Sequence, residues 1–168
     1  VVVAFYYRGL GPSSGTLSEE ALVDDGLQVL DWLCAKTQLP VSAIVIIGRS
    51  LGSGIAVQVA AARNVAGMIL ISPFDRLVNV IRNRIRFFPD FLLQDKFNSV
   101  EHISQVSCTI LCITGACDTT IPPELTKALF IQWAGQLIEH NVPEGRHRGL
   151  LRYHSVQSEV ALFLAELR

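Results

Sequence analysis

The chain has 168 residues, of which 50% are hydrophobic and 17% are charged. A chain of this length can fold as one domain with its own core, and so apolar a composition predicts strands that helices bury on both faces. The formal net charge of -1 offers no excess of basic residues for nucleic acid or an anionic membrane surface, and no apolar run approaches the roughly 20 residues that span a bilayer.

Strand-like and helix-like segments alternate along the chain. Five apolar runs bounded by turn residues predict strands, at residues 1–7, 43–47, 66–72, 109–114 and 136–142. Helical patterns lie between residues 16 and 33 and at residues 50–62, 122–133 and 153–167. This alternation predicts an α/β fold with a doubly wound, mostly parallel sheet and right-handed crossovers.

One stretch, residues 73–106, interrupts the alternation. It has no convincing strand pattern and is rich in Phe and Leu, so an insertion at about residues 74–98 is either a small helical cap over a pocket or an ordinary packing helix. Arg82, Arg84 and Arg86 alternate with apolar residues in this stretch. We interpret them as the solvent-facing side of a surface helix rather than as a phosphate-binding tract.

A Gly-x-Ser-x-Gly sequence, GRSLG at residues 48–52, joins the second predicted strand directly to the second predicted helix. A nucleophile elbow requires this arrangement, because its serine occupies a strained strand-to-helix turn in which bulky neighbours do not fit. Gly48 and Gly52 meet that demand, which makes Ser50 the candidate nucleophile. The turn also points the backbone N–H of Leu51, at a helix N-terminus, toward the oxygen that becomes negative during acyl transfer.

A serine hydroxyl is a weak nucleophile at neutral pH, so it needs a histidine base that a carboxylate holds in place. Asp118 follows the strand at residues 109–114, and His147 follows the strand at residues 136–142. Both loops come after the carboxyl ends of strands, where open sheets place ligands and catalytic groups. The sequence therefore predicts a Ser50, Asp118, His147 triad at one edge of the sheet.

Each of these assignments has a structural alternative. Asp118 could serve only to cap a helix that begins near Pro122. Arg146 and Arg148 flank His147, and two cations so close would disfavour the imidazolium that catalysis forms unless they turn to solvent. Three other histidines compete with His147 for the role of base: His102, His140 and His154.

Four motifs carry a resemblance to a known family: RGLG at residues 8–11 with Gly15, GRSLGSG at 48–54, GACDTTIP at 115–122 and PEGRH at 143–147. They resemble the successive landmarks of the α/β-hydrolase family, in particular its BEM46-like, ABHD13-like and ABHD17-like serine hydrolases. The resemblance implies a single α/β-hydrolase domain over residues 1–168, amino-terminally incomplete, whose first strand corresponds to the fourth strand of the fold. The order serine, acid, histidine is that of the family. Known members are esterases, thioesterases and depalmitoylases that need no cofactor.

The function that the resemblance implies is hydrolysis of a carboxylic ester or thioester through an acyl-enzyme, with Ser50 attacking, His147 moving the proton, Asp118 orienting His147 and the Leu51 N–H binding the oxyanion. The family's other oxyanion donor would lie in a loop before Val1. The alternative is a catalytically inactive or truncated hydrolase-fold module, an interaction or assembly subunit whose exposed sheet edge a protein partner covers. We expect an acyl ester or other small-molecule substrate, no nucleic acid, no metal, no membrane segment in this chain, and a cytoplasmic location unless a preceding segment carries a leader or an anchor.

Overall fold

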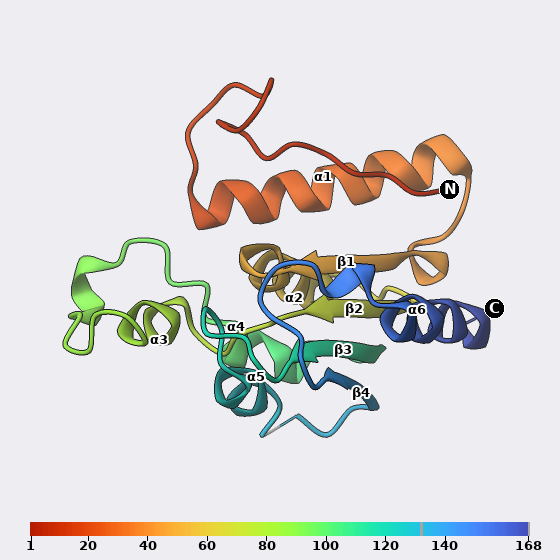
Figure 1. Ribbon diagram of the computed structural model, residues 1–168. Coiled ribbons are helices and arrows are strands. Elements are labelled where there is room, and N and C mark those ends of the chain that lie inside the picture. Colours follow the sequence, from red (N-terminus) through yellow and green to blue (C-terminus); the bar gives the residue numbers. More distant parts are fainter. Residues whose placement is uncertain (132, 168) are drawn as a thin grey trace.

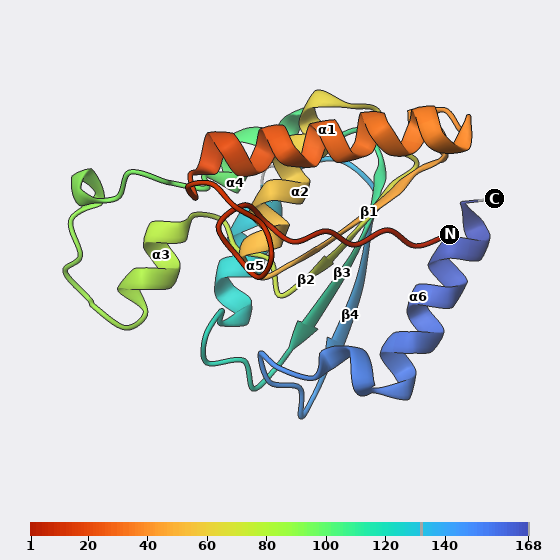
Figure 2. The same cartoon turned by 90° about the horizontal axis from the view of Figure 1, so that it is seen from above.

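The computed structural model describes residues 1–131 and 133–167. Four strands form one parallel sheet in the order β1-β2-β3-β4, namely β1 (Val45–Arg49), β2 (Gly67–Ile71), β3 (Thr109–Gly115) and β4 (Leu137–Val142). Each of them lies close to a predicted strand. Helices cover both faces of this sheet (Figures 1 and 2), so the predicted parallel α/β architecture is confirmed.

The four predicted helices are also present. On one side of the sheet lie α1 (Glu19–Thr37), α2 (Leu51–Ala62) and α5 (Pro123–Phe130), and on the other side lies α6 (His154–Glu166). The hydroxyl of Ser18 accepts a hydrogen bond from the Ala21 N–H and so caps α1. Gln132, which falls in the predicted helix at 122–133, lies outside the described residues. Within the described chain, no helix has both the length and the apolarity to cross a bilayer.

The core lies on both faces of the sheet. β2 is buried along its whole length, with Met68 and Leu70 in the cluster beneath α1 and α2, and Ile69 and Ile71 in the cluster beneath α6. This alternation follows from the period of two in a strand. Burying each such side chain contributes roughly 1.5–3 kcal/mol, so the central strands anchor the loops at their carboxyl ends.

Residues 1–7 are not a strand, and that prediction is wrong for this structure. The segment runs alongside α1, above the sheet (Figure 1), and pairs with no strand in the described chain. Between it and β1 lies a cavity of about 140 Å³, lined by Val3, Phe5 and Tyr7 and by residues of α1, α2 and β1. Apolar residues alone do not make a strand, because a strand requires a neighbour to which its backbone can hydrogen bond. β1 consequently forms a free edge of the sheet within the described residues.

The insertion after β2 projects from the sheet as an arm of short helices (Figures 1 and 2). It contains α3 (Leu77–Arg82), a 3₁₀ turn at Asp90–Leu92, and then α4 (Ser99–His102), which leads back toward β3. Arg84 and Arg86 follow the end of α3, so the interpretation of Arg82, Arg84 and Arg86 as one helix face is wrong. Residues two apart do not share a face of a helix, which is the physical reason.

Candidate active site

Ser50 occupies the turn between β1 and α2. Its backbone has φ 52° and ψ -123°, a strained conformation for a residue with a side chain, and its N–H donates to the Ile71 carbonyl at 2.9 Å. A Cβ at Gly48 would lie 2.6 Å from the carbonyl oxygen of Gly52, so the turn closes only with glycine at that position. These are the features of a nucleophile elbow.

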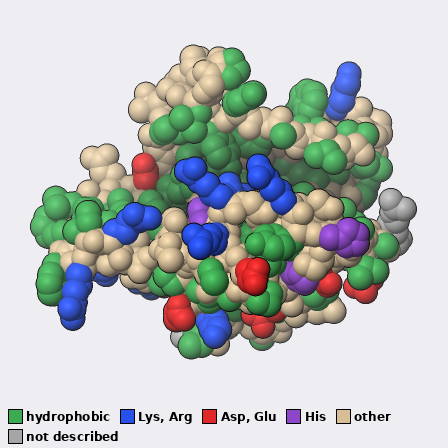
Figure 3. Space-filling view, viewed as in Figure 1, with side chains coloured by type: hydrophobic (Ala, Val, Ile, Leu, Met, Phe, Trp, Pro, Cys, Tyr) green, Lys and Arg blue, Asp and Glu red, His purple; other side chains and the backbone are tan. Residues whose placement is uncertain are grey.

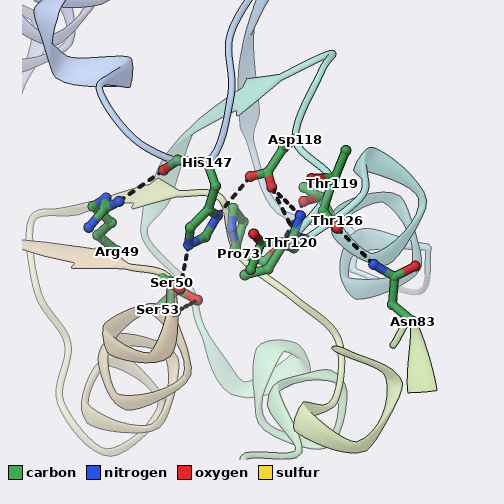
Figure 4. Close-up of polar contacts among 11 residues, drawn as sticks. Arg49, Ser50, Ser53, Pro73, Asn83, Asp118, Thr119, Thr120, Thr126 and His147 are labelled. Carbon is green, nitrogen blue, oxygen red and sulfur yellow. Dashed lines mark hydrogen bonds and ion pairs between the residues drawn. The ribbon is translucent and has the colours of Figure 1, made fainter. Parts of the chain in front are cut away.

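Ser50, His147 and Asp118 form one continuous chain of hydrogen bonds (Figure 4). The Ser50 Oγ lies 3.0 Å from the His147 Nε2, and the His147 Nδ1 lies 2.9 Å from the Asp118 Oδ2. The three side chains come from loops at the carboxyl ends of β1, β3 and β4. Residues 97 and 29 positions apart in the sequence are thus brought within hydrogen-bonding reach at one edge of the sheet.

Asp118 holds the imidazole with a carboxylate that is itself held on both oxygens. Its side chain is only 1% exposed, and its Oδ1 accepts hydrogen bonds from the backbone N–H groups of Thr120 and Ile121, both at 2.9 Å. α5 begins at Pro123, so Asp118 caps the preceding turn rather than the helix. One oxygen of Asp118 thus has a capping role, close to the structural alternative considered for this residue, and the other oxygen is directed at His147.

The acid loop and the histidine loop interlock through Gly115 and Gly145, which belong to the motifs GACDTTIP and PEGRH but to which sequence reasoning assigned no role of their own. The Cys117 N–H donates to the Gly145 carbonyl at 2.9 Å. A Cβ at Gly115 would overlap that same carbonyl, and a Cβ at Gly145 would lie 2.9 Å from the Gly115 Cα. This backbone contact sets the separation of Asp118 and His147. The only signal in the sequence is the position of each glycine near the end of a strand.

Arg49, the second residue of the elbow motif, also holds the histidine loop. Its guanidinium Nη2 donates to the backbone carbonyl of His147 at 2.9 Å (Figure 4). Because Arg49 directly precedes Ser50, this bond ties the loop that carries His147 to the end of β1, next to Ser50. The sequence contained no signal for it, since the bond depends on how two distant loops approach each other.

The backbone N–H of Leu51 lies at the first residue of α2, beside Ser50. No hydrogen-bond acceptor contacts it among the described residues, so it is available to a developing oxyanion at the positive end of the helix dipole. The phenol oxygen of Tyr7 lies over Gly52, where a Cβ would come within 2.8 Å of it. Burial raises the pKa of Tyr7, so its hydroxyl stays protonated at neutral pH.

The other three histidines lie elsewhere. His102 ends α4, His140 is in β4 with its Nε2 3.3 Å from the Ser155 Oγ, and His154 begins α6 beside Ser158. Among the described residues, only His147 makes a hydrogen bond with Ser50.

Solved structures share this arrangement of elements. An alpha-beta hydrolase from Vibrio vulnificus matches with a TM-score of 0.76, at 20% identity, over 93% of this chain and 61% of that chain. An acetyl xylan esterase from Paenibacillus sp. R4 matches with a TM-score of 0.73, at 18% identity, over 97% of this chain and 60% of the other. The chain has the α/β-hydrolase fold.

Curated relatives match about three quarters of this chain but are much longer than it. The uncharacterized protein Rv2307c of Mycobacterium tuberculosis is 34% identical over 129 residues, which are 76% of this chain and 46% of that protein. The lysophosphatidylserine lipase ABHD12 of Gallus gallus is 32% identical over 150 residues, covering 77% of this chain and 38% of the lipase. The chain thus spans less than half the length of these relatives.

No family model matches the chain. The relatives bear out the hydrolase fold that the motifs of the sequence resemble. The narrower resemblance, to BEM46-like, ABHD13-like and ABHD17-like hydrolases, receives no support from them and stays a prediction.

Proposed function

We propose that this chain carries the catalytic machinery of a serine hydrolase that cleaves a carboxylic ester or thioester through an acyl-enzyme. The observation that carries the proposal is the unbroken chain Ser50 Oγ, His147 Nε2 and Nδ1, Asp118 Oδ2, with links of 3.0 and 2.9 Å. Each role follows from the chemistry of its group.

In the first half of the reaction, the Ser50 Oγ attacks the acyl carbon while the His147 Nε2 takes the hydroxyl proton. The Asp118 carboxylate keeps the other ring nitrogen protonated and stabilises the imidazolium. His147 then delivers the proton to the departing alcohol or thiol, and the acyl group stays on Ser50. In the second half, His147 activates a water that attacks the acyl carbon and releases the acid, so that Ser50 regains its proton.

The negative oxygen of each tetrahedral intermediate would accept a hydrogen bond from the Leu51 N–H. The N-terminus of the 12-residue helix α2 adds its positive partial charge at the same point. One such donor in other enzymes is worth roughly 10²- to 10³-fold in turnover.

The relatives support an ester substrate. The name of ABHD12 describes it as a lysophosphatidylserine lipase, and a solved structure with the same fold is an acetyl xylan esterase. Because the chain spans less than half of the curated relatives, the activity and substrate of the whole protein remain part of this proposal.

The second candidate function is a non-catalytic module that binds a partner along its sheet edge. The observation that favours it is that β1, among the described residues, pairs with β2 alone, and that Ile47 on this edge strand is exposed. An unpaired edge with apolar neighbours is a surface on which another strand can add. The position of Ser50 against His147 has no role in such a module, which is why we favour the enzyme.

A fluorophosphonate probe separates the two functions without knowledge of the substrate, because it reacts with activated serines. We expect the full-length protein to be labelled at Ser50, located by peptide mass spectrometry, and the Ser50→Ala variant to remain unlabelled. Ser158→Ala is the matched control, since the Ser158 Oγ also lies 3.4 Å from a histidine nitrogen, that of His154, but should react no more than any surface serine. Absence of Ser50-dependent labelling in the wild-type protein would end the enzyme proposal.

A further inference from the structure

A basic cleft opens beside the candidate active site. It has a volume of about 890 Å³, and its lining includes His147 together with Arg84, Arg146 and Arg148. The space-filling view in Figure 3 shows Lys and Arg side chains gathered in the middle of one face, with a histidine among them. The whole chain is nearly neutral, with 14 basic and 15 acidic residues, so this gathering is local.

The three arginines reach the cleft from two distant parts of the chain. Arg146 and Arg148 flank His147, whereas Arg84 comes from the turn after α3 in the insertion. A hydrogen bond of 2.9 Å from the Asn83 Nδ2 to the Thr119 carbonyl fixes that turn against the acid loop (Figure 4). The insertion is thus held where its arginine faces the other two.

These guanidinium groups lack partners of opposite charge. Within the described chain, no carboxylate lies within 4 Å of Arg84, Arg146 or Arg148, whereas Arg8, Arg63 and Arg76 each meet an acid. Asp118, whose neighbours Cys117 and Thr119 line the cleft, is buried and directed at His147. Three neighbouring cations repel one another, and an anion bound between them would relieve that repulsion.

An apolar pocket lies beside Leu51, the residue that directly follows Ser50. It has a volume of about 390 Å³, and its lining is dominated by leucines and one phenylalanine, namely Leu17, Leu22, Leu51, Leu77, Leu92, Leu93 and Phe97. Leu51 directly follows Ser50, and His147, which lines the basic cleft, hydrogen bonds to the Ser50 hydroxyl. Each cavity therefore has a lining residue that adjoins Ser50. The insertion contributes side chains to both.

We propose that the basic cleft is a binding site for an anionic group, a phosphate or a carboxylate, on the leaving group of the substrate. The substrate class is then a single-chain acyl ester with an anionic head group. The basic cleft is assigned to the leaving group because His147 lines it. His147 must deliver its proton to the leaving group and therefore borders the space that the leaving group fills. The acyl chain lies in the leucine-lined pocket. This inference rests on the proposed function of Ser50.

Arginine suits this role because its planar guanidinium donates two parallel hydrogen bonds to a phosphate or carboxylate. Arg146 and Arg148 are exposed, so they reach solvent rather than the imidazole, and an anion between them would offset their opposition to an imidazolium at His147. The sequence analysis expected these two cations to disfavour the imidazolium unless they turned to solvent, and both are exposed.

The test compares two esters with the same acyl chain in the full-length protein: 1-hexanoylglycerol 3-phosphate, which carries the anion, and 1-hexanoylglycerol, which does not. Their short chains keep both monomeric. We expect kcat/KM to favour the phosphate ester by about 10-fold or more at low ionic strength, and the preference to shrink as salt is added. Arg84→Gln, Arg146→Gln and Arg148→Gln should each lower the preference, by about 3- to 10-fold.

Arg86→Gln is the matched control. Arg86 is two residues from Arg84 and carries the same charge, but its guanidinium lies over the Phe87 ring, 5.5 Å from the centroid, and does not line the cleft. This variant should keep the wild-type preference. Equal rates for the two esters, or an equal loss in Arg86→Gln and Arg84→Gln, would overturn the anion site.

Binding to the Ser50→Ala variant separates failure of this inference from failure of the proposed function. That variant should bind 1-hexanoylglycerol 3-phosphate more tightly than 1-hexanoylglycerol, and further loss of Arg84 should remove the difference. Inorganic phosphate should compete weakly for the same site, which distinguishes a head-group site from one for free phosphate. Ser50-dependent hydrolysis of the neutral ester with no preference for the anion would contradict the anion site alone, and absence of Ser50 labelling would contradict the proposed function.

Discussion

The Asp118 carboxylate is the residue on which the geometry of the candidate site depends most. It is almost fully buried, with one oxygen on two backbone N–H groups and the other on His147. A buried carboxylate with all its partners in place has one orientation, and that orientation sets the tautomer and tilt of the imidazole. Ser50 then meets a ring nitrogen that is free to accept its proton.

Asp118→Asn tests that dependence. The amide keeps the shape of the side chain and an oxygen for the Thr120 and Ile121 N–H groups, but it presents an N–H to the His147 Nδ1 and favours the wrong tautomer. We expect kcat to fall roughly 10⁴-fold with a small change in melting temperature. Steady-state kinetics and thermal unfolding measure the two effects. Asp90→Asn, an exposed acid in the insertion, is the control, and an Asp118→Asn variant that retains full activity would remove Asp118 from the site.

At the scale of elements, the site is assembled by loops that leave the carboxyl ends of neighbouring strands. The end of β3 and the loop after β4 come so close that glycine is required where they touch, at Gly115 and Gly145. Arg49 at the end of β1 reaches the same loop. The buried strands hold these loops in place, which is why residues far apart in the chain can act together.

Gly115→Ala should disturb the site without touching a catalytic group. The added methyl group would overlap the Gly145 backbone, which has no side-chain freedom with which to yield, so the histidine loop must move away from Asp118. We expect a loss of about 1–3 kcal/mol in unfolding free energy and a fall in kcat larger than the change in KM. Ala116→Ser, which adds one atom to the exposed neighbouring residue, is the control. Unchanged stability in Gly115→Ala would show that the two loops are not in contact.

The segment before α1 is attached to that helix by an ion pair between Arg8 and Asp25. The hydrogen bond from Arg8 lowers the pKa of the Asp25 carboxyl. A lowered pKa in the folded state means that the pair stabilises the fold at pH values above the ordinary carboxyl pKa, about 3.9, and that this contribution is lost as the pH falls through the folded-state pKa.

Asp25→Asn should therefore lower stability at pH 7 and make little difference in acid. Urea unfolding of the wild type and the variant across pH 7 to pH 3 measures the difference in unfolding free energy. We expect the wild type to have the larger unfolding free energy at pH 7, and the difference between the two proteins to shrink toward zero as the pH falls below about 4. A difference that stays constant or grows on acidification would contradict the pairing.

At the scale of the molecule, some features could be predicted from sequence because they depend on local pattern. The buried strands, the strand-turn-helix around Ser50, and the loops that carry Asp118 and His147 each follow from residues close together in the chain. Whether residues 1–7 form a strand could not be predicted, because an apolar segment becomes a strand only when another strand pairs with it. The approach of Arg84 to Arg146 and Arg148, and the Gly115–Gly145 contact, depend on how separate loops converge.

The whole molecule also places two unlike surfaces near one serine, since each has a lining residue that adjoins Ser50. The leucine-lined pocket and the arginine-lined cleft both draw residues from the insertion after β2. This insertion packs on the core through Phe97 and Ile103, on either side of α4. The proposed amphipathic substrate depends on this arrangement. The predicted cap at residues 74–98 stays a prediction.

The most direct test of the account is whether Ser50 and His147 act as one unit. kcat/KM for p-nitrophenyl butyrate is measured in the full-length wild type, Ser50→Ala, His147→Ala and the double variant. Each single change should cost roughly 10⁴- to 10⁶-fold, and the double variant should lose no more than the worse single variant, because removing either partner already disables the other. Losses that multiply in the double variant, or a single variant that keeps wild-type activity, would contradict a shared catalytic role.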